Sequence, residues 1–335
     1  MTETTFLTDN RSRSRNITFI GGFGLLILLF LVGLIAGAVD ISFNELYACI
    51  IGDTTAENYR IIHYLRMPRV IACAMTGANL ALAGCILQGI LRNPLADPGI
   101  IGVTAGAGVA AMTLMLLAPE LTYLVPLAAF AGALIAVAIV FSLAWEHGIQ
   151  PLRMILAGVA IAAFFGGGSS ALSIFYSDKI QGTVNWLAGG FNGVSWQYVF
   201  MIMPYTIIGI IATFASSRNL NALQLGDDVA TSLGLNVEKI RFFLLTLSAL
   251  LAASAVSVAG LLGFVGLIVP HIMRLLVGSD FNYLLPVSAL FGAALVVGAD
   301  TAARTLFSPI EVPVGIFLSF LGAPFFLYLL KRRLN

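Results

Sequence analysis

Ten apolar segments run through this chain, separated by short polar stretches, and they limit its fold more than any other feature. A helix needs about 20 consecutive apolar residues to cross the hydrocarbon core of a bilayer. Charged residues make up only 10% of the sequence, against about 25% in a typical soluble domain, so they are too few to cover a water-facing surface. The sequence therefore predicts an all-α integral membrane protein with about ten transmembrane helices, of which the eighth is short. The expected spans are Ile17–Val39, Val70–Ile90, Ile100–Ala118, Tyr123–Trp145, Met154–Phe175, Val199–Ala215, Phe242–Leu262, Phe264–Val277, Leu284–Ala303 and Val312–Leu330.

Basic residues flank both ends of this series and indicate how the chain is oriented. An even number of spans places both termini on one side of the membrane. Because cytoplasmic loops carry an excess of Lys and Arg, we expect that side to be the cytoplasm. This threading puts twelve of the 17 basic residues inside and five outside. We expect residues 1–16 to form a cytoplasmic tail and residues 17–335 a single transmembrane domain. The first apolar segment is counted as a span because it is longer than the apolar region of a cleaved signal peptide. The flanking basic residues are Arg11, Arg13, Arg15, Lys331, Arg332 and Arg333.

Ionisable groups are nearly absent from the expected spans. Such groups mark proton relays and ion sites, yet only Asp300 lies inside a span, four residues before Arg304, which is the spacing of an i,i+4 ion pair. His63, His147 and His271 fall at separate span ends. The pattern argues against a stand-alone transporter driven by an ion gradient, and it predicts no metal site.

Motifs for catalysis or ATP binding are also missing from the sequence. Neither the phosphate-cradling G-x-x-x-x-G-K-[ST] pattern nor a His-Glu-x-x-His or Gly-x-Ser-x-Gly cluster occurs, which disfavours an intramembrane enzyme. Cys49, Cys73 and Cys85 form no C-x-x-C pair and are interpreted as small apolar residues of the interior. If transport through this chain is active, another polypeptide must supply the energy.

The longest polar stretch on the expected inner side is Ser216–Lys239, between the sixth and seventh spans. Gly226 followed by Asp227 and Asp228 predicts a turn into a short helix with acids at its positive end, and Gly234 predicts the end of that helix. Such a helix is either a docking element for a partner or a solvated connector, and the residues alone leave both open. The side expected to be apolar consists of Val229, Ala230 and Leu233.

Four stretches in a fixed order carry a resemblance that covers the chain from about residue 60 to its C-terminus. They are Leu65–Arg69 (LRMPR), Gly84–Gly99 (GCILQG leading to NPLADPG), Leu225–Gly234 (LGDDVA through LG) and Gly263–His271 (GFVGLIVPH) with Arg274. Together they resemble the FecCD family, the type II ABC-importer permeases for ferric siderophores, haem and vitamin B12.

This resemblance implies a subunit of ten helices in the bacterial cytoplasmic membrane that carries no catalysis and no cofactor of its own. Its expected partners are a second permease subunit, either identical or a sister chain, two cytoplasmic ATPases and an extracytoplasmic substrate-binding protein. ATP and magnesium would be bound by the ATPases. A ferric siderophore is the expected cargo, with cobalamin and haem as alternatives.

The same resemblance implies roles for individual residues. The segment that couples the permease to the ATPase would comprise Gly226, Asp227, Asp228, Ala230, Leu233 and Gly234. The cytoplasmic gate would comprise Asn93, Pro94, Leu95 and, after Gln150, Pro151 and Leu152. The pathway would be lined by Ser169, Ser170 and Ser173 of the fifth span, together with the eighth and tenth spans. The binding protein would dock on Arg66, Arg69 and Arg304, for which headgroup anchoring, or the pair of Arg304 with Asp300, is the competing interpretation.

Overall fold

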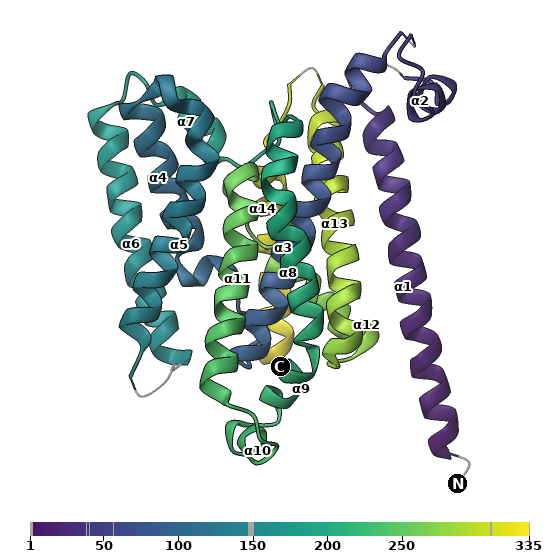
Figure 1. The fold of residues 1–335 in the computed structure, drawn as a ribbon, viewed down its shortest axis with the longest axis vertical. Helices are drawn as coiled ribbons and strands as arrows, with labels where there is room; N and C mark the ends of the chain where they lie inside the picture. The colour runs from purple at the N-terminus through teal and green to yellow at the C-terminus, as the bar shows by residue number, and fades with distance from the viewer. Residues whose placement is uncertain are drawn as a thin grey trace.

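The computed structural model describes residues 3–37, 39, 41–55, 57–146, 151–308 and 310–334 as a bundle of helices (Figure 1). Seven helical segments are long and apolar enough to cross a membrane, and three shorter apolar helices complete the set. The structure thus confirms an all-helical membrane protein with about ten spans. These spans are α1 (Glu3–Ile35), η1 (Ile61–Arg66) continuing into α3 (Met67–Ile90), α4 (Val103–Leu117), η3 (Pro119–Leu124) continuing into α5 (Val125–Ala144), α6 (Pro151–Phe175), α8 (Trp196–Ala215), α11 (Val237–Ala259), α12 (Val265–Val277), α13 (Phe281–Thr305) and α14 (Val314–Leu334).

Helix boundaries differ from the expected spans mainly where a helix continues into water. The first helix begins at Glu3 and ends at Ile35, whereas the apolar segment suggested 17–39. The seventh begins at Val237 because the side chain of Asn236 accepts a hydrogen bond from the backbone N–H of Lys239 (3.1 Å) and caps it. An apolar pattern detects the lipid-embedded part of a helix and misses polar turns that lie beyond it.

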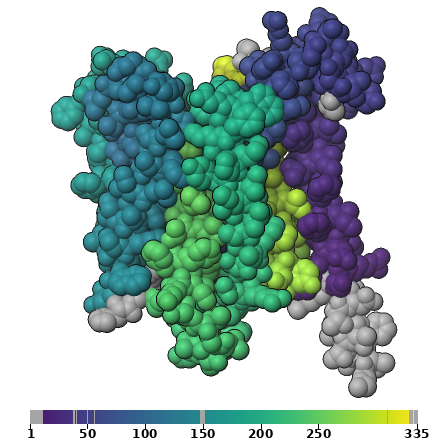
Figure 2. Space-filling model, viewed as in Figure 1, coloured from purple at the N-terminus to yellow at the C-terminus, as the bar shows by residue number. Residues whose placement is uncertain are grey.

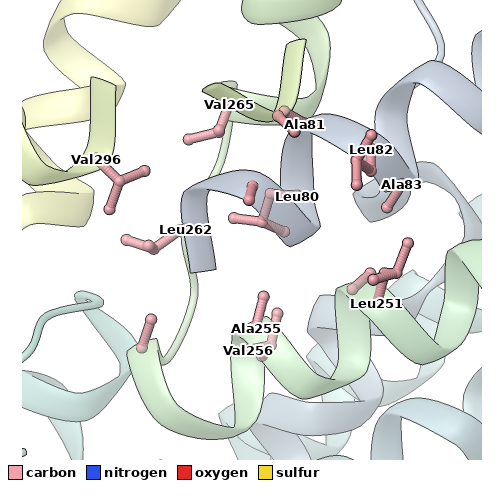
Figure 3. Packing of buried hydrophobic residues seen from close by; sticks show 14 of the residues in the cluster. Leu80, Ala81, Leu82, Ala83, Leu251, Ala255, Val256, Leu262, Val265 and Val296 are labelled. Carbon is pink, nitrogen blue, oxygen red and sulfur yellow. The ribbon is translucent and has the colours of Figure 1, made fainter. Parts of the chain in front are cut away.

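Three central helices, α3, α11 and α13, form the core of the bundle. In their most apolar stretches 83%, 78% and 56% of the residues are buried, against 17% in α1 and 6% in α6. The core is aliphatic and includes Leu80 and Leu82 of α3 and Leu251 and Val256 of α11 (Figure 3). The nearly unburied α6 therefore presents its surface to lipid or to another protein.

Glycines set the spacing at the crossings of α3 with its neighbours. A Cβ built on Gly77 would lie 2.1 Å from the carbonyl oxygen of Gly292 in α13, and one built on Gly84 would lie 1.9 Å from that of Gly266 in α12. The helix backbones are thus in direct contact, as small residues permit in membrane interiors. A buried polar link reinforces the core, since the side-chain amide of Asn79 donates to the hydroxyls of Thr206 (2.8 Å) and Ser254 (3.1 Å).

Five short helices connect the spans and distinguish the two ends of the bundle. The segment of α9 and α10 projects beyond the spans at the end where α1 begins and where the C-terminus lies, and α2 and α7 lie at the opposite end (Figures 1 and 2). With the orientation expected from the basic residues, the α9–α10 end faces the cytoplasm. The short helices are α2 (Phe43–Ile50), η2 (Pro98–Ile101), α7 (Gln181–Leu187), α9 (Ser217–Gln224) and α10 (Asp227–Ser232).

Candidate functional site

The projecting helix α10 lies where the glycine-bounded segment was expected. Gly226 precedes it with φ 115° and ψ 155°, and Gly234 follows it with φ 83°. Both backbone conformations are open to glycine and strained for other residues. The two glycines therefore turn the chain sharply into and out of the helix.

The apolar side of α10 differs from the expected one. Ala230 is fully buried against the bundle, so grouping it with Val229 and Leu233 was wrong. The exposed apolar side chains here are Leu225, which caps the end of α9, and Val229 and Leu233 of the α10 turn, 63%, 42% and 61% exposed. Val229 and Leu233 are one helical turn apart and share one face of α10, and Leu225 adds a third exposed apolar side chain from α9 at the inner end of the bundle.

Asp227 fixes the start of α10 to two other parts of the chain. Both of its carboxylate oxygens accept hydrogen bonds at 3.0 Å from Arg241 of α11, and Arg92, just after α3, is paired with the same carboxylate. Partial burial alone would raise the pKa of Asp227, but these two guanidinium groups outweigh it and hold that pKa below its ordinary value. Asp228 is exposed, so the two adjacent acids have different surroundings.

The loop with Asn93, Pro94 and Leu95 connects α3 to η2 at the same end of the molecule. The side chain of Asn93 accepts a hydrogen bond from the backbone N–H of Leu95 (3.0 Å), which folds the loop into a compact turn. Gln88 of α3 donates to the carbonyl of Gly266 in α12 (3.2 Å) and more weakly to that of Ala96 (3.4 Å). Arg274 of α12 in turn donates to the side chain of Gln88 (3.0 Å), so two of the sequence motifs meet at one point.

The second expected gate element lies at the start of α6. Gln150 is outside the described residues, and α6 begins at Pro151, followed by the exposed Leu152. A Cβ built on Gly158 would lie 1.9 Å from the carbonyl oxygen of Ile100, so α6 and η2 are in backbone contact. The structure therefore brings the first turns of α6 against the segment that follows the Asn93 loop.

A cavity of about 710 Å³ lies beside this loop, between the entry to α12 and the helix α14. Asp97, Thr104 and Ser319 supply polar atoms to its mainly apolar lining. The expected participation of the eighth and tenth spans fits this position, but Ser169, Ser170 and Ser173 do not line the cavity. The hydroxyls of Ser170 and Ser173 donate to the carbonyls of Gly166 and Ser169 in the preceding turn of α6.

Asp97 and Ser319 are functional candidates that the sequence did not single out for a role. Asp97 is part of the NPLADPG stretch, and that motif is the signal that could have identified it. Ser319 has no comparable signal, because a serine within an apolar helix is usually satisfied by its own backbone, as Ser319 is by the carbonyl of Gly315 (2.8 Å). Among the described residues, no group of three or more His, Cys, Asp or Glu side chains could hold a metal ion.

The three expected docking arginines lie together at the opposite end of the bundle. Arg66 donates to the carbonyls of Leu34 (2.8 Å), Ile35 (2.5 Å) and Val39 (2.6 Å), and Arg304 donates to those of Gly33 and Ala36 (2.6 Å). Both side chains thereby satisfy the last turn of α1, where unpaired carbonyls carry the negative end of the helix dipole. They are almost fully buried.

Arg69 links this buried pair to the surface. Its guanidinium group binds Asp300 through two hydrogen bonds of 2.9 Å and also binds Glu311 at 3.0 Å. The expected pair of Arg304 with Asp300 exists but is longer, at 3.7 Å. A hollow of about 510 Å³ opens at this end, with Arg66, Arg69, Arg304 and Glu311 in its lining. Docking of a binding protein on these arginines stays a prediction.

Comparison with known proteins agrees with this architecture. The FecCD transport family matches residues 25–332. The Fe(3+)-citrate import system permease protein YfmE of Bacillus subtilis (strain 168) is 38% identical, over 92% of this chain and 92% of its own. The hemin transport system permease protein HmuU of Yersinia pestis is 39% identical over 92% and 93% of the two chains.

Two further similarities extend the range of cargoes and add a solved structure. The cobalamin import system permease protein BtuC of Halobacterium salinarum is 43% identical over 82% of this chain and 74% of its own. A solved inward-facing ABC transporter described as of metal-chelate type superposes with a TM-score of 0.85 at 30% identity, covering 94% of this chain and 98% of its own. This chain therefore belongs to the FecCD transport family and is a multi-pass membrane permease of the ABC-importer type, a transport component and not an enzyme.

Proposed function

We propose that this permease carries a ferric siderophore across the bacterial cytoplasmic membrane, driven by ATP hydrolysis on two separate ATPase subunits. The dependence on a partner ATPase is supported most by the exposed apolar side chains of Leu225, Val229 and Leu233 on the α9–α10 segment, which projects from the inner end of the bundle. Apolar side chains exposed beyond the spans are not needed for contact with lipid and fit a groove on a partner protein. ATP and magnesium would belong to that partner.

The outer end supports docking of a substrate-binding protein. Arg69 is the member of the arginine cluster whose partner, Glu311, reaches the surface, with 44% of its side chain exposed. A carboxylate from a binding protein would replace Glu311 on Arg69, because both acids present the same charge and geometry to a guanidinium group. Arg66 and Arg304 would line the receiving hollow and keep their bonds to α1.

The exposed helix α6 supports a second permease subunit, identical or a sister chain. Only 6% of its most apolar stretch is buried, and Gly166 and Gly167 have open space beside them. Two such faces packed together would cover the glycines and enclose a pathway between subunits. A charge-poor pathway suits a permease whose selectivity lies in the binding protein.

Uptake measurements test the cargo. In a strain without other iron importers, deletion of this gene should abolish uptake of a radiolabelled ferric siderophore, and the wild-type gene should restore it. The variant Leu225→Glu/Leu233→Glu should lose ATPase binding and fail to restore uptake. The control Ile51→Glu, at an exposed apolar residue just after α2 at the opposite end, should bind the ATPase as the wild type does. Ferric citrate and hydroxamate permeases are among the relatives, and loss of haem or cobalamin uptake alone would overturn the siderophore assignment.

A further inference from the structure

The side chain of Arg92 bonds to both short helices of the inner end. Its Nε donates to the carbonyl of Leu223 in α9 (2.9 Å), and its Nη2 is paired with Asp227 at the start of α10. Arg92 itself lies two residues after the end of α3 and directly before the Asn93–Leu95 turn. A single residue thus connects the projecting segment to the start of the loop beside the cavity.

The backbone of Arg92 makes this choice of residue unusual. Its φ is +48°, in the left-handed region, and only one other non-glycine residue among those described, Phe264, has a positive φ. Helices that end in this conformation normally use glycine, which has no Cβ to strain. Arginine at this position carries a conformational cost that glycine would avoid, which indicates that its side chain has a role.

The far end of the loop is anchored independently of Arg92. Gln88 contacts the carbonyl of Ala96, and Ala96 is itself buried. The loop is therefore a compact turn held at its first residue by the α9–α10 segment and at its last by α3 and α12. A displacement of α10 acts on one end of the loop and leaves the other in place, which changes its shape.

We propose that Arg92 is a positioning residue that transmits movement of α10 to the 93–97 loop, so that this loop follows the ATPase-facing helix. This inference rests on the proposed function. An ion pair of two half-exposed side chains adds little to stability, so its value to the protein lies in the mechanical link. Arg241 of α11 binds the same carboxylate and orients the start of α10 so that Asp227 stays within reach of Arg92.

A reconstituted complex of permease, ATPases and binding protein tests the link. Arg92→Gly retains the left-handed backbone and removes the side chain, and Arg92→Lys retains a charge without the two-directional fork. We expect Arg92→Gly to hydrolyse ATP while import per ATP falls about tenfold, a size typical of a coupling free energy. Arg92→Lys should lie between this variant and the wild type. The control Arg218→Gln, at an exposed arginine of α9, should behave as the wild type.

Two results of this assay would overturn the inference. One is an unchanged ratio of import to hydrolysis in Arg92→Gly, and the other is a parallel loss of both activities, which indicates a structural role alone. If Arg92→Gly does not assemble, Arg92→Lys provides the same comparison. Failure of the wild-type complex to import any ferric chelate would instead refute the proposed function.

A distance measurement between the loop and α10 tests the link through Arg92 and needs no cargo. Spin labels on Asn93→Cys, directly after Arg92, and on Ser232→Cys in α10 should keep their separation when the ATPases bind nucleotide, because the start of the loop moves with α10. In the Arg92→Gly background the separation should change with nucleotide. A separation that changes equally with and without Arg92 would show that the loop does not follow α10.

Discussion

The two ends of the bundle each contain an aspartate held by two arginines, in opposite surroundings. At the outer end, Asp300 lies inside α13 with 3% of its side chain exposed, bound by Arg69 and approached by Arg304. At the inner end, Asp227 begins a six-residue helix with 49% of its side chain exposed, bound by Arg92 and Arg241. The same three charges therefore form a rigid cluster at the outer end, called the fixed joint below, and an ion-pair cluster that can rearrange at the inner end, called the inner joint.

Burial accounts for this difference. Charges removed from water are stable only while every partner is present, because an uncompensated buried charge is very costly. The outer cluster also satisfies the end of α1, so its geometry is determined from several sides. The inner pair is screened by water, and its bonds can break and re-form at little cost.

Removal of the outer carboxylate should give the largest effect. Asp300→Asn leaves Arg69 and Arg304 close together without their shared counter-charge, so the free energy of unfolding should fall by about 3–5 kcal/mol. Chemical denaturation in detergent micelles measures this change. Asp228→Asn, at an exposed acid of α10, is the matched control and should change it by less than about 0.5 kcal/mol. An equal loss in both variants would show that the outer cluster is not a fixed joint.

Loss of one cap on α1 should have a smaller effect. Arg66→Met keeps the apolar stem and removes the donors to two carbonyls in the last turn of α1 and to that of Val39 after it, so the free energy of unfolding should fall by about 2 kcal/mol. Hydrogen exchange should rise first in the last turn of α1, which localises the change. Exchange that rises evenly over the bundle would contradict a capping role.

Strain at the entry to α10 should have a still smaller effect on folding. Gly226 has a backbone conformation that only glycine adopts easily, so Gly226→Ala should cost about 1 kcal/mol. Gly182→Ala, at a glycine of α7 with ordinary φ and open space beside it, should be neutral. The import rate of Gly226→Ala should fall below that of Gly182→Ala even under conditions where both variants are fully folded. An unchanged import rate would show that the position of α10 is not critical.

The spans and the projecting helix could be predicted from the sequence because each depends on local pattern. An apolar stretch of sufficient length forms a helix in lipid whatever its neighbours are, since its backbone must bond internally. Gly226 and Gly234 bound α10 through their own backbone freedom, which is also local.

Pairings between distant residues could not be predicted in the same way. The i,i+4 spacing indicated Arg304 as the partner of Asp300, yet Arg69, 231 residues away, takes both carboxylate oxygens. Likewise, α10 could be expected to have one apolar side, but Ala230 is buried while Val229 and Leu233 are exposed, because the packing of α10 on its neighbours sets its rotation. Only tertiary contacts decide which of several arginines reaches an acid.

Acid should weaken the ion pairs of Asp227, and of the four predicted changes in the free energy of unfolding this one should be the smallest. Because the folded-state pKa of Asp227 is held below the ordinary value of 3.8, its ion pairs stabilise the fold above that value and lose their contribution as the pH falls through the lowered pKa. The stability difference between wild type and Asp227→Asn should therefore be constant near neutral pH and vanish in acid. In Arg241→Gln the loss should begin at higher pH, because Arg241 contributes most to the lowering. A difference that stays constant from about pH 7 to about pH 3 would show that Asp227 gains nothing from its arginines in the folded state.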